Sequence, residues 1–528
     1  MMTSEPATAA QTVFMQLDEE GRAWFLLNGG ALTLASLDTA LGRPTCVQIA
    51  EHVWERLEAN CAAVRQIARG PAPAYGINTG FGPLCRKRIS PDQVETLQGN
   101  LIVSHAVGVG DPAPPEVVRW MLLFKILALS HAVSGASRQT LEALCRLLEA
   151  DMLPVVPTQG SVGASGDLAP LAHMVLPILG RGTVTLQGQQ LPAADALTQF
   201  NLNPITLGPK EGLALINGTQ FMSAYGAVLV ICARRLLKHA DLIATMSLEA
   251  MRGSLRPFDA RLQELRPHRG ARESAANVRK LMTDSQILPS HAQCERVQDP
   301  YSLRCVPQVH GASREAVHHA AEVMETEINS VTDNPVILGP EEVISGGLFH
   351  GQPLALVLDY LAMALAELAS ISERRIYLLL AGAEELPPLL MQNTGLNSGF
   401  MLPQYTAAAL VSENKGLCMP ACVDSIPTSL GQEDHVSMGA RSAVKCMRVL
   451  ENAETVLAIE LMCAAQALDY RVPLQPGIGP RLAHGEVRRC IAHAEQDRLF
   501  GDDIQTSLAL IRSQRLLYVV EKELGKMC

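Results

Sequence analysis

Hydrophobic residues recur every three or four positions along much of this chain, which is the spacing of one face of an α-helix. Residues 49–68, IAEHVWERLEANCAAVRQIA, show this spacing clearly, and residues 116–150 continue it over a longer stretch. Pro114 and Pro115 stand directly before the longer stretch, where proline favours the start of a helix. Nearer the N-terminus, AWFLLNG and ALTLASL are short and predict strand-like pieces. The first part of the chain is therefore expected to combine helices with a few short strands.

After Gly218 the helical spacing becomes longer and more regular. Four segments, rich in Ala and Leu and poor in internal Gly and Pro, keep this spacing: residues 218–252, 311–330, 350–381 and 432–468. Long helices with apolar faces pack most simply as an elongated bundle. We therefore predict a mainly α-helical fold, with an N-terminal domain over residues 1–217 and an elongated helical-bundle domain with C-terminal helices over residues 218–528.

Composition and charge limit the kinds of protein that this chain can be. Hydrophobic residues make up 48% of it and aromatic residues only 4%, so aliphatic side chains must build the core, which favours helices. The net charge of −10 (43 − 53) is spread without long runs, which argues against nucleic acid or an anionic membrane as a partner. The N-terminus lacks the basic start and apolar core of a signal peptide, and no apolar run reaches membrane-spanning length. We expect a soluble cytoplasmic protein.

The cysteines do not form a recognisable framework. Their number, 13, is odd, and they are scattered along the chain. Cys418 and Cys422 are separated by three residues, but no second Cys or His pair completes a zinc site. We therefore expect reduced thiols and no metal ion.

One glycine-rich cluster between predicted helices has an unusual composition. Residues 158–174, TQGSVGASGDLAPLAHM, place glycines at 160, 163 and 166 around Ser165. A turn or a helix cap is the ordinary role of such a serine. A serine nucleophile would need a base and an oxyanion hole, and the spacing here is not the G-x-S-x-G nucleophile elbow.

A third interpretation of this cluster is a backbone ring. The nitrogen of Gly166 can attack the carbonyl of Ala164, and loss of water from the ring and then from Ser165 leaves an exocyclic methylene, which is an electrophile. Gly166 presents an unhindered nitrogen, Ala164 adds little bulk, and the flanking glycines allow the close approach. These residue types permit the ring without requiring it.

The cluster closely resembles the signature of the aromatic amino acid ammonia-lyases, in which an Ala-Ser-Gly tripeptide becomes the methylidene-imidazolone (MIO) cofactor. The resemblance runs from about residue 30 to the C-terminal helices. Its other blocks follow in the same order: YGINTGFG, SHAVGVG, KEGLALINGTQ, QDPYSLRC, SVTDNP, FMLPQYTAAALVSENK and SIPTSLGQEDHVSMG. It implies an N-terminal domain that carries MIO, formed autocatalytically from Ala164, Ser165 and Gly166, on the central helical bundle.

The resemblance also assigns roles in the removal of ammonia, which takes a proton from Cβ and expels the amine. Tyr75 matches the base of the family, a role that requires positive surroundings such as helix N-termini to lower its pKa. Asn217 matches the support of the MIO carbonyl oxygen, although it could also cap the long helix that follows. Arg304 suits a bidentate grip on the substrate carboxylate. The remaining expected residues are Tyr301, among the catalytic ones, and Gln298, Asn334 and Phe349, which bind substrate; Phe349 could equally be a core residue.

Two positions indicate which amino acid is bound. An imidazole has two ring nitrogens that need partners; Glu433 can accept a ring N–H, and His105 can hydrogen-bond or orient the ring. A phenyl ring beside an unpaired buried carboxylate is disfavoured by desolvation. The pattern is similar to that of the histidine-specific members, so we predict elimination of ammonia from L-histidine to give trans-urocanate.

Several positions near the substrate end depart from the pattern of those members. They are Leu348, Gln352, Met419, Leu430 and Gly431. A lyase for a histidine analogue or for tyrosine, and an MIO-dependent aminomutase that adds ammonia back at Cβ, therefore stay open as alternatives. A non-catalytic paralogue is a third class, against which the intact Ala-Ser-Gly tripeptide argues.

The length of the bundle helices bears on assembly. A helix of about thirty residues spans roughly 45 Å, so one chain could hardly bring all the expected site residues to one point. Four antiparallel bundles packed side by side could do so. The resemblance implies the same arrangement, a homotetramer whose active sites are built from three chains.

Overall fold

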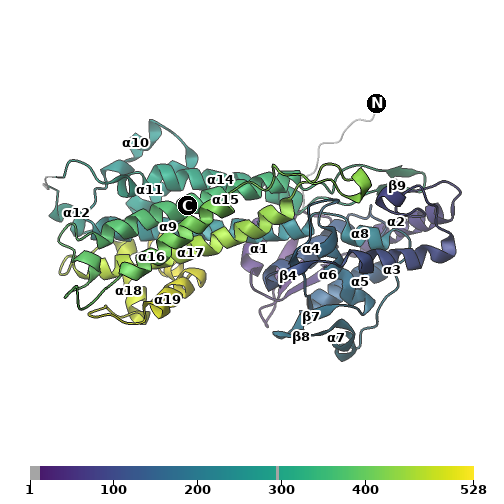
Figure 1. The fold of residues 1–528 in the computed structure, drawn as a ribbon, viewed down its shortest axis with the longest axis horizontal. Helices are drawn as coiled ribbons and strands as arrows, with labels where there is room; N and C mark the ends of the chain where they lie inside the picture. The colour runs from purple at the N-terminus through teal and green to yellow at the C-terminus, as the bar shows by residue number, and fades with distance from the viewer. Residues whose placement is uncertain (1–11, 293–295) are drawn as a thin grey trace. The chain divides into compact units, whose positions relative to one another are not determined.

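A computed structural model describes residues 12–292 and 296–528 of the chain. These residues are mainly helical, which confirms the predicted fold class (Figure 1). They form two compact units: unit 1 consists of Met1–Val228, Ala321–Leu358 and Pro420–Val444, and unit 2 of Leu229–Ala320, Asp359–Met419 and Lys445–Cys528. Each unit is built from stretches that are far apart in sequence. The expected boundary between residues 217 and 218 stays a prediction.

Unit 1 opens with a small three-stranded sheet. Strand β2 (Ala23–Leu27) pairs antiparallel with β1 (Phe14–Leu17) and parallel with β3 (Thr45–Ile49). The alternation of AWFLL buries every second residue of β2, as expected of a strand with one face on the core. The prediction of a strand at ALTLASL was wrong, because Thr33 caps a helix there, α1 (Leu34–Ala40), and accepts a hydrogen bond from Ser36 N.

Two helical predictions in unit 1 have different outcomes. The pattern over residues 49–68 becomes helix α2 (Glu51–Arg69). The long stretch is not one helix but two, α4 (Pro115–Ser130) and α5 (Arg138–Glu149). The backbone leaves the helical conformation between them, with φ of 61° at Ala132 and 78° at Gly135, and a Cβ at position 135 would lie 2.7 Å from Val64 Cγ2, so glycine is required there. Ser137 then caps α5 by accepting from Thr140 N.

The rest of unit 1 consists of short elements around the buried helices α4 and α8. They are α3 (Val94–His105), α6 (Leu168–Val175), α7 (Ala193–Gln199) and α8 (Glu211–Ile216), with the strands β4 (Val109–Pro112), β5 (Leu153–Pro154), β6 (Pro157–Gln159), β7 (Thr183–Leu186), β8 (Gln189–Pro192), β9 (Val336–Gly339) and β10 (Glu342–Ile344). The strands form the pairs β4-β6 and β9-β10 and the sheet β5-β7-β8. All six residues of α8 are buried.

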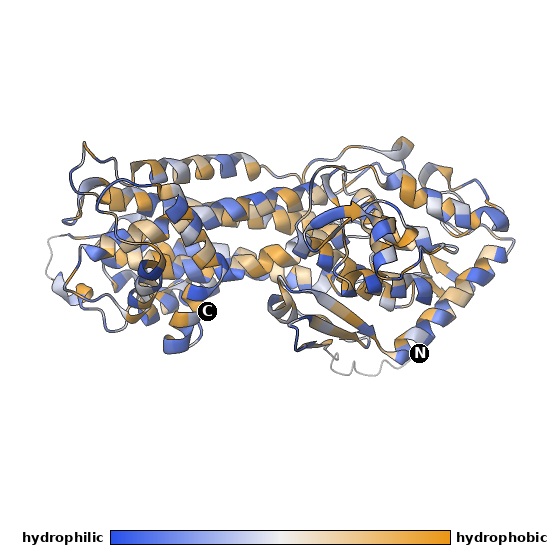
Figure 2. Ribbon diagram, turned by 90° about the horizontal axis from the view of Figure 1, so that it is seen from below, coloured by the Kyte–Doolittle hydropathy of each residue, from blue (hydrophilic) through white to orange (hydrophobic). Residues whose placement is uncertain are grey.

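The four long helices predicted after Gly218 are present. They are α9 (Gln220–Ala250), α14 (Val306–Glu327), α15 (Gln352–Leu380) and α17 (Gly439–Asp469). Hydrophobic and hydrophilic residues alternate along them in short bands, as in amphipathic helices (Figure 2). Helix α15 is long and apolar enough to cross a membrane by length and composition, contrary to the expectation from sequence. However, 67% of its most apolar window is buried inside the structure, as in the core helix of a soluble protein.

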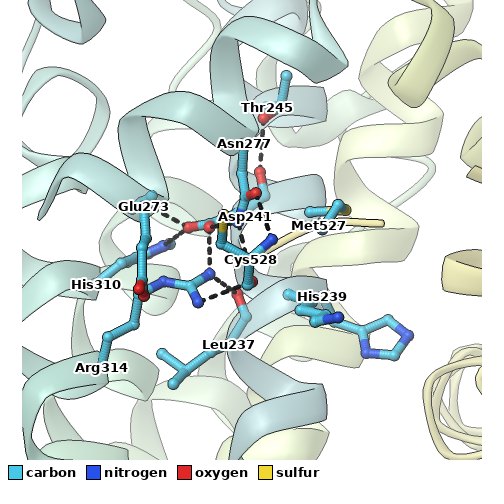
Figure 3. Close-up of polar contacts among 12 residues, drawn as sticks. Leu237, His239, Asp241, Thr245, Glu273, Asn277, His310, Arg314, Met527 and Cys528 are labelled. Atoms are coloured by element: carbon cyan, nitrogen blue, oxygen red, sulfur yellow. Dashed lines mark hydrogen bonds and ion pairs between the residues drawn. The ribbon is translucent and has the colours of Figure 1, made fainter. Parts of the chain in front are cut away.

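Unit 2 adds shorter helices to the long ones. They are α10 (Ala260–Glu264), α11 (Arg269–Leu281), α12 (Ile287–Ser290), α13 (Tyr301–Arg304), α16 (Met401–Leu417), α18 (Ile478–Cys490), α19 (Phe500–Arg512) and α20 (Arg515–Leu524). Its interior contains a buried charged cluster (Figure 3). Asp241 accepts hydrogen bonds from Arg314 Nη2 (2.5 Å) and Asn277 Nδ2 (2.9 Å), and its Oδ1 lies 2.8 Å from His310 Nδ1. Burial alone would raise the pKa of Asp241, but Arg314 and His310 hold it well below its usual value.

Candidate active site

A cavity of about 680 Å³ opens in unit 1. Its lining comes from five stretches: the loop after α2, the glycine-rich cluster, the end of α8, the loop before α15 and the loop before α17. They bring together seven of the residues expected from sequence: Tyr75, Ala164, Ser165, Asn217, Asn334, Phe349 and Glu433. A second hollow of about 380 Å³ shares Tyr75, Ser165 and Glu433 with the first and adds His105 at the end of α3.

The glycine-rich cluster adopts a backbone that other residues fit poorly. Gly163 and Gly166 have φ of 80° and 78°, and Ser165 between them is also left-handed at 50°. A Cβ on Gly163 would lie 2.2 Å from Ser437 Oγ, and one on Gly166 would lie 2.1 Å from Gly218 O. The glycines are therefore required by close approach to neighbouring segments, and the serine is held in a strained conformation.

Two donors face the carbonyl oxygen of Ser165. Asn217 Nδ2 donates to it at 2.9 Å and the backbone N–H of Gly218 at 3.4 Å. Asn217 Oδ1 is buried and has no hydrogen-bond partner among the described residues. In return, Gly218 O accepts from Asp167 N at 2.7 Å. The strained tripeptide is thus held against the turn between α8 and α9 by hydrogen bonds at Ser165 O and at Asp167 N.

The alternative role of Asn217, a cap for the long helix, is filled by another residue. Asp167 Oδ2 accepts hydrogen bonds from Phe221 N and Met222 N, both at 3.0 Å, at the start of α9. Burial raises the pKa of Asp167 to about 7, although these two N–H groups oppose the shift. Asp167 also stands at the N-cap position of α6, but its side chain makes no cap hydrogen bond to that helix.

Tyr75 lies in the cavity with its hydroxyl accepting a hydrogen bond from Gly82 N at 3.1 Å. Burial raises the pKa of Tyr75, and the nearby charge of Glu433 raises it further, while the Gly82 N–H opposes both. The expectation of a lowered pKa is therefore not met by the surroundings that this chain provides. A single backbone donor does not outweigh desolvation and an adjacent carboxylate.

Glu433 and His105 present polar groups to the same hollow. Glu433 Oε2 is buried and has no hydrogen-bond partner within the described parts of the chain. Such an atom costs free energy unless a ligand or water satisfies it. Burial lowers the pKa of His105, which favours its neutral ring, and its Nδ1 lies 3.1 Å from Ser104 Oγ.

Asn334 and Phe349 come from the segment that precedes α15. Asn334 Oδ1 accepts from Gly346 N at 2.7 Å and so holds the loop that carries Phe349. Phe349 is half-buried and lines the cavity, so it is not the core phenylalanine that was the alternative.

The other three expected residues, Gln298, Tyr301 and Arg304, belong to unit 2, and none of them is among the described residues that line the cavity. Tyr301 is 71% exposed, and the Arg304 guanidinium carbon lies 4.6 Å from its ring centroid. The loop beneath them is fixed by Asp299, whose Oδ2 accepts from Ser254 N at 2.7 Å. Tyr301 thus begins the short helix α13, directly after an anchored loop, and faces solvent in the single chain.

The cavity also contains two residues that the sequence reasoning did not select, His350 and His435. Their rings stack with centroids 5.6 Å apart, and His350 Nε2 lies 3.4 Å from His435 O. Each directly follows or nearly follows a selected residue, so proximity to Phe349 and Glu433 in sequence was the available signal. Among the described residues, no group of three or more His, Cys, Asp or Glu side chains could hold a metal ion.

The positions that depart from the histidine-specific pattern are not among the described residues that line the cavity, although Leu348 and Gly431 adjoin lining residues in sequence. Gln352 Nε2 donates to Cys422 O at 3.1 Å at the start of α15. Leu348, Met419 and Leu430 are exposed, and Gly431 has φ 85° in a turn. None of these residues is among the described residues that line either hollow.

Comparison with known proteins identifies the class. The sequence profile of the aromatic amino acid lyases matches residues 32–489, so this chain belongs to that family and is a carbon–nitrogen lyase. A histidine ammonia-lyase of Sorangium cellulosum is 50% identical over 515 residues, which are 95% of this chain and 100% of that protein. The crystal structure of histidine ammonia-lyase from Trypanosoma cruzi has a TM-score of 0.87 at 40% identity, covering 95% of both chains. Tyrosine aminomutase from Streptomyces globisporus has a TM-score of 0.89 at 31% identity, covering 95% of this chain and 99% of that one.

Proposed function

We propose that this lyase eliminates ammonia from L-histidine to give trans-urocanate, on an MIO cofactor formed from Ala164, Ser165 and Gly166. The observation that carries the choice of substrate is the unsatisfied Glu433 carboxylate oxygen in the hollow that His105 also lines. An imidazole N–H can satisfy this oxygen, and a phenyl ring cannot. The similarity to histidine ammonia-lyases at 50% identity supports the same substrate.

The surroundings of Ser165 fit the formation of that cofactor. In a first condensation the Gly166 nitrogen bonds to the Ala164 carbonyl carbon, and the Ala164 oxygen leaves as water with the amide hydrogens of Gly166 and Ser165. In a second, the Ser165 hydroxyl and its Cα hydrogen leave as water, and a Cα=Cβ double bond remains. The left-handed conformations of Gly163, Ser165 and Gly166 bring this short segment into a tight turn, which favours ring closure.

The chain's own residues then perform the remaining tasks. The MIO cofactor supplies the carbon electrophile that makes the substrate amine a leaving group. Asn217 Nδ2 and the Gly218 N–H donate to the Ser165 carbonyl oxygen and stabilise negative charge that develops there. Tyr75 takes the proton from Cβ of the substrate, and Asn334 contributes to holding its carboxylate.

A complete site requires more than one chain. None of the described residues that line the cavity is Lys or Arg, although an amino acid substrate carries a carboxylate. We place Arg304, together with Gln298 and Tyr301, in the site of a neighbouring subunit of a homotetramer. Helix α15 offers a surface for such assembly, since Leu356, Tyr360 and Met363 are exposed along one face of it. We expect the enzyme in the cytoplasm, with no nucleic acid or membrane partner.

An aminomutase would use the same residues, and the similarity to tyrosine aminomutase makes it the second candidate. Purified protein is tested with histidine, tyrosine and phenylalanine, with urocanate followed by absorbance and β-amino acids by chromatography. Urocanate from histidine is the expected product, and the 158–174 peptide should lack two waters by mass. A β-amino acid as the main product would contradict the lyase, and no turnover of histidine would contradict the substrate.

A further inference from the structure

Lys125 is a buried cation close to the site that the proposed chemistry does not use. It lies in the apolar helix α4 and is only 1% exposed. Its ammonium donates to Asn217 O at 2.9 Å and to Ala214 O at 3.2 Å, both at the end of α8. The last carbonyl groups of a helix have no hydrogen-bond partner within the helix, and Lys125 supplies a donor for these two.

This placement is costly, and the cost is not offset by an ion pair. Lys125 makes no salt bridge within the described parts of the chain, whereas buried Lys210 pairs with Asp333 Oδ2 at 2.6 Å. Burial therefore lowers the pKa of Lys125 to about 7, although the charge of Asp333 opposes the shift. A leucine or methionine would fill the same space in α4 without this desolvation. The lysine must contribute something other than packing.

Lys125 and Ser165 form hydrogen bonds with opposite ends of the same peptide group, the one between Asn217 and Gly218. The carbonyl of Asn217 accepts from Lys125, and the N–H of the same peptide, on Gly218, donates to Ser165 O at 3.4 Å. The Asn217 side chain donates to that oxygen as well, at 2.9 Å. A cation on the oxygen end of a peptide polarises it, which strengthens the donor at its nitrogen end.

We propose that Lys125 is a positioning residue: it fixes and polarises the Asn217–Gly218 peptide, and so strengthens both donors on the Ser165 carbonyl oxygen. This inference rests on the proposed function, because that oxygen becomes the carbonyl oxygen of the cofactor. It assigns to Lys125 two effects, on formation of the cofactor and on the turnover that follows. Both depend on negative charge that develops at the same atom.

The test uses the full-length chain with Lys125→Met, which keeps the length and apolar stem of the side chain but removes its charge and donors. Ser130→Ala is the matched control, since Ser130 is buried in the same helix and bonds only to Leu127 O. Each preparation is analysed for the mass of the 158–174 peptide, for thermal unfolding, and for kcat and KM with histidine. Dividing kcat by the fraction of chains that have lost two waters separates turnover from cofactor formation.

We expect Lys125→Met to lower the dehydrated fraction, and to lower kcat per dehydrated chain at least about tenfold while KM changes less than about threefold. Lys125→Arg, which keeps the charge and donors, should recover part of both losses. The control should match the unchanged chain in all three measurements.

A dehydrated fraction and a corrected kcat within about twofold of the unchanged chain would overturn the inference. If Lys125→Met does not fold, Lys125→Gln takes its place. If neither folds while Lys125→Arg is fully active, the lysine serves the fold alone, which also overturns the inference. If the unchanged chain itself retains both waters, the proposed function fails first, and the two failures are thus distinguished.

Discussion

Replacing Glu433 with glutamine removes one negative charge from the cavity and leaves the shape of the side chain almost unchanged. Its Oε2 is buried without a hydrogen-bond partner among the described residues, so a substrate N–H can satisfy it. Loss of one charge-assisted hydrogen bond costs about 1.5–3 kcal/mol. Since each 1.4 kcal/mol is tenfold, kcat/KM for histidine should fall by about 10- to 150-fold.

The assay compares kcat/KM for L-histidine and L-phenylalanine in the unchanged enzyme and in Glu433→Gln. Phenylalanine has no N–H for the carboxylate, so its own low kcat/KM should hold steady or rise when the charge is removed. Asp434→Asn is the control, because this neighbouring acid also lines the cavity but is exposed to solvent. An equal loss for both substrates, or an equal effect of the control, would refute the idea that Glu433 recognises the ring.

Three further predictions concern other parts of the molecule. Ser165→Ala should fold but lose all activity, since alanine cannot lose water to form the methylene; activity within a few-fold of the unchanged enzyme would exclude the cofactor. Inactive Tyr75→Phe and inactive Arg304→Ala chains should recover partial activity when co-expressed, and no recovery from proven mixed oligomers would mean that both residues serve a site of the same chain. Asp241→Asn should reduce the free energy of unfolding at pH 7 by about 3–5 kcal/mol, because it leaves Arg314 buried without its counter-ion. The reduction is measured as a lower midpoint of urea unfolding. The pKa of Asp241 is depressed in the folded state, so the stabilisation that its charge provides is present above a pH of about 4 and is lost on acidification. The difference in free energy of unfolding between Asp241→Asn and the unchanged chain should therefore narrow below that pH. A difference that widens would contradict this role of Asp241.

Helix positions could be predicted from the sequence where a periodic apolar pattern ran without interruption by a cap or a left-handed residue. The four long helices after Gly218 are of this kind, because their apolar faces are continuous. The errors come from details, near or distant in sequence, about which periodicity carries no information. Thr33 caps a helix where a short strand was predicted, and the backbone turns left-handed at Ala132 and Gly135 between α4 and α5, where Val64, far away in sequence, leaves room only for glycine at position 135.

The candidate site likewise has features that the sequence could indicate and features that only the fold shows. The residue types around Ser165 permit a ring and the family resemblance implies one, and the structure adds the physical reason for the glycines, namely that Ser437 and Gly218 approach them too closely for a Cβ. Periodicity could not distinguish Lys125 from Lys210, because the carboxylate that pairs with one of them, Asp333, lies more than a hundred residues away in sequence. Which lysine has a counter-ion is a property of the fold.

The charge of the cavity links two findings that look separate. Burial and the charge of Glu433 raise the pKa of Tyr75 in the single chain, which disfavours its phenolate form, and none of the described residues that line the cavity is a Lys or Arg that could pair with a substrate carboxylate. Both findings reflect a shortage of positive charge around the cavity, and the negative charge of Glu433 adds to this shortage. Arg304, at the end of helix α13 in unit 2 and beside the exposed Tyr301, is the cation that we propose to meet this shortage in another copy of the chain. Assembly would then provide an arginine that binds the substrate carboxylate. The same cation would lower the pKa of Tyr75, because a positive charge favours the phenolate. A chain that cannot assemble should therefore keep Tyr75 largely in its neutral phenol form and bind the substrate less tightly.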